Sequence, residues 1–156
     1  MKTCKIIRVM MLIITLVSCT TTKKTIAVKK TLEQKIESKD FTFFVDRCLP
    51  TGLENSTFNS DVVLKLKNEI AYANLPFHGL LNVNPQQMTE GPINFNGEMK
   101  DFSMHYDKTK GWNILFKVEG NPYTYQVIMQ ISNKGNGIVK VESTKRSTMT
   151  YFGDVD

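Results

Sequence analysis

Three polar side chains of the types used by serine hydrolases alternate along one stretch of the sequence. Asp101, Ser103 and His105 supply a carboxylate, a hydroxyl and an imidazole. Apolar residues alternate with them, which predicts a β-strand whose same-face neighbours stand about 6.5 to 7 Å apart. A catalytic triad requires contacts of about 2.6 to 3.2 Å. The pattern therefore favours a solvated strand face, and we predict no catalytic residue and no enzyme.

The sequence contains no motif for a metal or a nucleotide. His78 and His105 are its only histidines, and no Cys, His or acidic cluster has the spacing of a zinc or calcium site. The glycines fall at expected hairpin turns rather than in a phosphate loop between a strand and a helix. We expect neither a metal nor a cofactor.

Aromatic residues give a better indication of binding. Six of them occupy strand-like segments and could line a cup between a sheet and a helix: Phe43, Phe44, Trp112, Phe116, Tyr123 and Tyr125. Ordinary core packing explains alternating aromatics equally well. Trp112, Phe116, Tyr123 and Tyr125 are the candidate residues for binding a small apolar ligand, with core packing as the alternative.

The first nineteen residues indicate where the protein resides. Three basic residues and no acid occupy positions 1–8, and an apolar run follows over 9–17, which is typical of a secretory signal. A spanning helix needs about 20 apolar residues, so this run is too short to cross a bilayer. Leu16-Val17-Ser18-Cys19 resembles the lipobox of bacterial lipoproteins. We predict a lipoprotein signal peptide at 1–18 and lipidation of Cys19, with an ordinary signal peptide as the alternative.

This reading leaves one cysteine for the folded part. Cys4 leaves with the signal and Cys19 carries lipid, so Cys48 has no partner for an intramolecular disulfide. We interpret Cys48 as a small buried hydrophobe rather than a reactive thiol.

Charge is concentrated near the start of the chain. Of the 20 basic and 15 acidic residues, three basic residues belong to the signal, so the net charge falls from +5 to +2. From Phe41 onward 11 basic residues stand against 12 acidic ones. A nucleic-acid-binding face needs clustered Lys and Arg, so we expect no nucleic-acid partner. The lysine-rich residues 19–30 are interpreted as a flexible tether, whose lysines could also meet anionic head groups.

The elements that would position these side chains are one short helix and a series of strands. Thr31 to Gln34 matches a capping box, which predicts a helix to about Ser38 with Leu32 and Ile36 on one face. Beyond it, alternation with a period of two and repeated turn signals predict eight or nine strands. These strands are expected around 41–47, 61–67, 70–74, 93–95, 99–106, 112–118, 123–131, 138–142 and 149–152.

Short connections between alternating strands indicate antiparallel neighbours with one dry face. We therefore predict a mainly β fold, a single curled antiparallel meander sheet that forms a partly closed barrel or a sandwich, with the helix near one opening. Residues 31–156 are expected to form this domain.

Several segments resemble the bacterial lipoproteins grouped as domain of unknown function 4251. The resemblance spans about Lys35 to Asp156 and rests on "IESKDFTFFVDRCLP", "LPFHG", "INFNGEMKDFSMHY", "GWNILFKVE", "YQVIMQISNKGNGIVKVES" and "RSTMTYFG". It implies a mainly β Gram-negative envelope lipoprotein and transfers no catalytic residue. The sequence departs from the usual family pattern at Phe77, His78 and Leu80, and at Lys145 before Arg146.

These observations predict a lipid-anchored protein of the cell envelope. No acidic residue directly follows Cys19, which favours the outer membrane, with the domain facing the periplasm or the surface. We expect a noncatalytic interaction or assembly module with an envelope protein as its partner. The alternative is a carrier or sensor that binds a small apolar ligand in a β cup.

Overall fold

The computed structural model describes residues 30–50, 56–57, 62–78 and 91–156. The predicted signal peptide, Cys19 and nearly all of the predicted tether lie outside these residues. Within them, no helix is long and apolar enough to span a membrane.

Nine antiparallel strands form one curled sheet, and the two-residue strand β2 (Ser56–Thr57) pairs with β1 beside it. The nine are β1 (Asp40–Pro50), β3 (Val63–Lys67), β4 (Ile70–Leu75), β5 (Ile93–Glu98), β6 (Lys100–Asp107), β7 (Gly111–Glu119), β8 (Thr124–Ile131), β9 (Asn136–Ser143) and β10 (Arg146–Val155).

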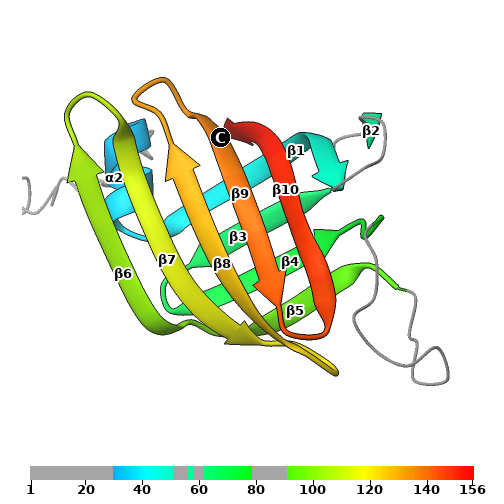
Figure 1. Ribbon diagram of the computed structural model, residues 1–156. Helices are drawn as coiled ribbons and strands as arrows, with labels where there is room; N and C mark the ends of the chain where they lie inside the picture. The colour runs from blue at the N-terminus through cyan, green and yellow to red at the C-terminus, as the bar shows by residue number, and fades with distance from the viewer. Residues whose placement is uncertain (1–29, 51–55, 58–61, 79–90) are drawn as a thin grey trace, which may run out of the picture.

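The sheet is a meander that nearly closes into a barrel. Its order is β5-β4-β3-β1-β10-β9-β8-β7-β6. Of the nine strands, consecutive ones therefore pair everywhere except between β5 and β6, and the last strand pairs with the first. Strands β6 to β10 cross in front of β1, β3, β4 and β5 (Figure 1). The ring stays open between β5 and β6, and the bridge Phe95–Gly120 instead links β5 to the residue that follows β7. The predicted curled meander is confirmed, in its barrel form.

Helix α2 (Leu32–Glu37) is the predicted short helix. The Thr31 hydroxyl accepts a hydrogen bond from the Gln34 amide at 3.3 Å, and the Gln34 side chain accepts one from the Thr31 amide at 3.1 Å. Ile36 is buried, and Leu32 packs against the same core. The expected capping box and apolar face are both confirmed.

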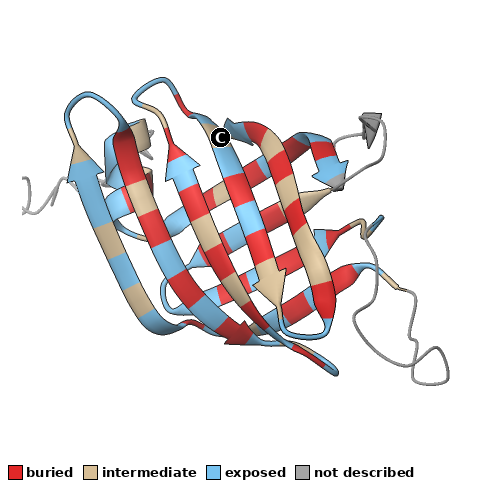
Figure 2. Cartoon of the chain, in the orientation of Figure 1, coloured by how far each residue is buried: buried red, intermediate tan, exposed pale blue. Residues whose placement is uncertain are grey.

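The barrel interior is filled by the inward residues of the strands. Buried positions alternate with exposed or intermediate ones along β7 and β8 (Figure 2), and Trp112, Ile114, Phe116 and Val118 all point inward on β7. The expectation for Phe44 was wrong: it is 36% exposed, because successive residues of a strand face opposite sides and Phe43 takes the inner one. Strand β6 is the sparsest, with Phe102 and Met104 only half-buried.

Candidate functional site

The predicted strand of Asp101, Ser103 and His105 lies at the open edge of the barrel. All three side chains are exposed on β6. The Lys117 ammonium donates to the Asp101 carboxylate at 2.8 Å, and this contact lowers the pKa of Asp101. Among the described residues, no hydrogen bond joins Asp101, Ser103 and His105 to one another. They therefore do not form the hydrogen-bonded chain of a hydrolytic triad.

Cys48 and His78 occupy contrasting places. Cys48 is fully buried in the core, where burial raises the pKa of its thiol. This placement fits the interpretation as a small hydrophobe. His78 is exposed beyond the end of β4. Within the described ranges, no group of three or more His, Cys, Asp or Glu residues could hold a metal.

The four candidate aromatic residues lie inside the barrel. Trp112, Phe116, Tyr123 and Tyr125 all belong to the continuous hydrophobic core. Tyr125 packs against the Phe95 ring at 5.8 Å between centroids and meets the Tyr123 ring edge-on at 6.4 Å. These rings fill space between the two layers of the barrel, and a ligand-binding role for them stays a prediction.

Arg146 is the buried charged residue of this core. Only 4% of it is exposed, and its guanidinium lies 4.7 Å from the Phe77 ring and 4.8 Å from the Tyr123 ring. Nη1 also donates to the Gly91 carbonyl at 2.9 Å. Arg146 thereby joins the first residue of β10 to the segments after β4 and before β5 and to the β7–β8 turn.

Tyr151 reinforces this end of the barrel. Its hydroxyl donates to the Pro76 carbonyl at 2.7 Å, and burial raises the pKa of Tyr151 far above its ordinary value. Both Tyr151 and Arg146 thus hold the segment after β4 through buried contacts. We assign them to the support of the barrel end, since no feature of their geometry indicates a reaction.

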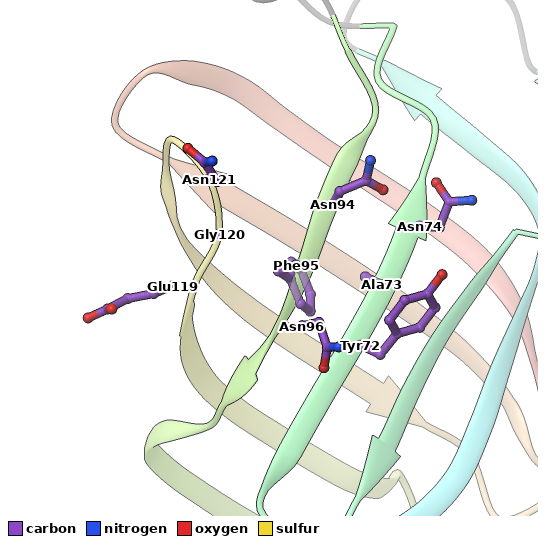
Figure 3. A pocket seen from close by; sticks show the side chains of 9 residues that line it. All are labelled: Tyr72, Ala73, Asn74, Asn94, Phe95, Asn96, Glu119, Gly120 and Asn121. Carbon is purple, nitrogen blue, oxygen red and sulfur yellow. The ribbon is translucent and has the colours of Figure 1, made fainter.

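The outer face of β4 and β5 carries an open hollow of about 670 Å³. Its lining combines polar side chains with apolar surface, one exposed tyrosine and the β7–β8 turn: Tyr72, Ala73, Asn74, Asn94, Phe95, Asn96, Glu119, Gly120 and Asn121. Figure 3 shows Tyr72, Asn74, Asn94 and Asn96 along the two strands, while the Glu119 side chain points away from them.

Strand register brings these residues together. Tyr72 stands opposite Asn96, and Asn74 stands opposite Asn94, so all four share the outer face of the sheet. The β7–β8 turn forms the remaining wall across the gap in the barrel. Sequence reasoning missed this site because its three parts are distant in the chain. The available signal was the repeated Asn in strand segments, where Asn is disfavoured.

Gly120 allows the turn to approach β5 closely. A Cβ at this position would lie 2.7 Å from the Tyr125 ring and 2.9 Å from the Asn94 carbonyl oxygen. The Gly120 amide donates to the Tyr123 carbonyl at 2.8 Å, which closes the turn. A side chain at position 120 would therefore push the turn away from β5.

Two other hollows on the outer surface differ in their hydrogen bonding. One, of about 530 Å³, includes Gln126 and Glu142, which are hydrogen-bonded to each other at 3.2 Å. The other, of about 370 Å³, includes Arg47, stacked on Phe152 at 4.9 Å. These lining side chains are therefore already engaged within the protein. In the hollow of β4 and β5, no hydrogen bond between described residues uses the side-chain amide of Asn74, Asn94, Asn96 or Asn121.

The fold and its interior define the protein as a nearly closed antiparallel β-barrel with a short helix and a packed core. The model of the family described as a domain of unknown function, DUF4251, matches residues 23–155. The chain therefore belongs to this family, as the resemblance in the sequence predicted.

A solved structure is similar in fold. It is the crystal structure of a DUF4251 family protein from Bacteroides eggerthii DSM 20697 at 1.95 Å resolution, with a TM-score of 0.60 and 17% sequence identity. The match covers 77% of this chain and 80% of that chain. No curated protein matches the sequence significantly. The family description names no molecular function, and nothing in the described residues indicates catalysis.

Proposed function

We propose that this protein is a lipid-anchored envelope protein whose barrel is a noncatalytic interaction module, and that it recognises its partner on the outer face. The contrast between the inner and outer faces of the sheet carries this proposal. Inward aromatic residues such as Phe116 and Tyr125 are buried in a continuous core, whereas the outer face of β4 and β5 has an open, polar hollow. Concave surfaces with a few convergent polar groups are the usual form of a binding site.

The anchor in this proposal is Cys19, supported by the lipobox-like Leu16-Val17-Ser18-Cys19. Two or more acyl chains hold a protein stably on a bilayer. The predicted tether, residues 19–30, would then connect the lipid to the barrel, with a reach of about 40 Å when fully extended. This length suits a domain that stands clear of the membrane and meets partners in the periplasm or at the cell surface.

Site-specific photocrosslinking in the native envelope tests the interaction module. A benzophenone amino acid replaces Tyr72 in the full-length protein, and the matched control replaces Tyr106, which has similar exposure but lies outside the hollow. We expect a reproducible macromolecular adduct from position 72 and not from position 106. Absence of an adduct at position 72, or equal adducts from both positions, would contradict the proposal.

A second candidate function is a carrier for a small apolar ligand, favoured by the sparse cover along β6. Phe102 and Met104 are only half-buried there, and the exposed Tyr106 ring packs on Trp112 at 4.8 Å between centroids. An apolar molecule could approach the core by this edge. Saturable quenching of Trp112 fluorescence by a long-chain fatty acid, lost in Phe116→Ala, would support a carrier. Unchanged fluorescence would exclude fatty acids as its cargo.

A further inference from the structure

We infer that the hollow on β4 and β5 binds a neutral, hydroxyl-rich ligand, namely a segment of a sugar chain. This inference rests on the proposed function and names the ligand class of that site. Four amide side chains and one exposed tyrosine ring surround an open space of about 670 Å³. Few ligand classes match a lining with so many neutral donors and acceptors.

The amides supply the hydrogen bonds. Each Asn side chain offers two N–H donors and a carbonyl acceptor, so it can bind one hydroxyl as donor and its neighbour as acceptor. Asn74, Asn94 and Asn96 lie on paired strands, and Asn121 lies on the facing turn. None of these side-chain amides is used in a hydrogen bond between described residues. They can therefore bind a ligand without breaking an internal contact.

The placement of asparagine is costly for the strands themselves. Asn is among the residues that strands disfavour, and β-branched or aromatic residues would stabilise this face better. Asn74, Asn94 and Asn96 nevertheless cluster on the outer face of two neighbouring strands. Local choices that oppose the fold without an internal gain are expected at functional sites.

Tyr72 supplies the apolar contact. Its residue surface is 42% exposed, and it stands opposite Asn96 in the register. An exposed aromatic ring beside polar groups presents a flat face to C–H groups and a hydroxyl to water or ligand. A sugar ring has both features, with C–H groups on one face and hydroxyls at its edge. The same pairing of Tyr and Asn serves adaptable polar recognition in antibody binding sites.

Charge argues against an anionic ligand. Among the described residues that line the hollow there is no Lys or Arg. Glu119 is the charged residue among the described lining residues; it accepts a hydrogen bond from the Lys100 ammonium at 2.6 Å, and its side chain points away from the asparagine side chains (Figure 3). A phosphate or a uronic acid would find no cation to compensate its charge. The ligand is therefore uncharged.

Calorimetric titration of the full-length lipoprotein tests this inference, in a non-ionic detergent that has no sugar head group. The probes are short oligosaccharides of glucose, mannose and galactose, with an oligogalacturonate as the anionic counterpart. We expect at least one neutral probe to bind, and the anionic probe to bind more weakly. Failure of all neutral probes at millimolar concentration, or tighter binding of the anionic probe, would overturn the inference.

Variants link the binding to the hollow. Tyr72→Ala and Asn94→Ala should each lower the affinity for the oligosaccharide by about tenfold or more, which corresponds to the loss of one good contact. Tyr72→Phe should retain most of the affinity because the ring remains. Tyr106→Ala is the matched control, since Tyr106 is 46% exposed and lies outside the hollow. Equal affinities for Tyr72→Ala and the unchanged protein would refute the site.

The two proposals fail in different ways. A protein adduct from position 72 together with no oligosaccharide binding would refute the sugar ligand and leave the interaction module standing. If position 72 gives no adduct and no oligosaccharide binds, both proposals are refuted.

Discussion

A buried arginine requires compensation, because the desolvation of a guanidinium costs several kcal/mol. At Arg146 the compensation comes from two aromatic faces and a backbone carbonyl. The planar group suits this geometry, since it stacks on rings and donates in its own plane at the same time. Arg146 therefore acts as a fastening between β10 and the segments around β4 and β5.

Arg146→Lys should destabilise the protein although the charge is kept. An ammonium cannot stack between Phe77 and Tyr123 while donating to the Gly91 carbonyl, so we expect the free energy of unfolding to fall by about 1 to 3 kcal/mol. Urea unfolding of the full-length protein measures it. The neighbouring exposed residue gives the control, Lys145→Ala, which should change stability by less than about 0.5 kcal/mol. Equal stability of both variants would contradict the role of Arg146.

Asp107 gives a prediction about pH. Its carboxylate accepts hydrogen bonds from the Thr109 hydroxyl, the Thr109 amide and the Lys110 amide, which lower its pKa from 3.8 to about 2. The pKa of Asp107 is lower in the folded state, so its contribution to stability is complete above its ordinary value and is lost as pH falls toward 2. An NMR titration should show the lowered pKa of Asp107, and Thr109→Val should raise that pKa. Titration of Asp107 near 3.8 would contradict the turn geometry.

The inward and outward residues of most strands follow from the sequence, but adjacent aromatics do not. The alternation predicts the buried faces of β7 and β8 correctly because each has one dry side. At Phe43 and Phe44 two large apolar residues adjoin, and the pattern alone cannot say which one faces inward. The hollow was also beyond prediction, since Tyr72, Asn94 and Asn121 meet only through register and closure.

At the scale of elements, the main feature is the way in which the ring closes. Pairing of β1 with β10 joins residues about a hundred positions apart, and no local pattern encodes it. Strands β5 and β6 are the two edges of the sheet, and they are not paired with each other. The β6 edge carries a bulge between Lys100 and Ser103, and ion pairs to Lys100 and Lys117 beside it, which disfavour pairing with other chains.

Gly120→Ala tests how closely the β7–β8 turn must approach β5. The added methyl group would overlap the Tyr125 ring and the Asn94 carbonyl, so we expect the free energy of unfolding to fall by about 1 to 3 kcal/mol. Gly97→Ala is the matched control on β5, because a Cβ there would have its nearest neighbour at 3.4 Å. Thermal unfolding compares the two. Equal melting temperatures would show that the turn can move without cost.

At the scale of the whole molecule, we propose that a packed barrel is held at the membrane by a lipid on a separate segment. Trp112, Phe116 and Tyr125 are buried in the barrel core, and we propose that recognition takes place outside it. Membrane attachment would then depend on Cys19 alone, and recognition on the outer face. The leader pattern supports the first part, and the open hollow on β4 and β5 supports the second.

Native mass spectrometry of the protein extracted from its own envelope tests this account most directly. We predict a chain that begins at Cys19 with fatty acyl groups attached, and no apolar small molecule retained in the barrel. Cys19→Ser should give a product without lipid that is released from the membrane. An intact leader, an unmodified Cys19 thiol, or a stoichiometric apolar molecule bound inside the barrel would contradict the account.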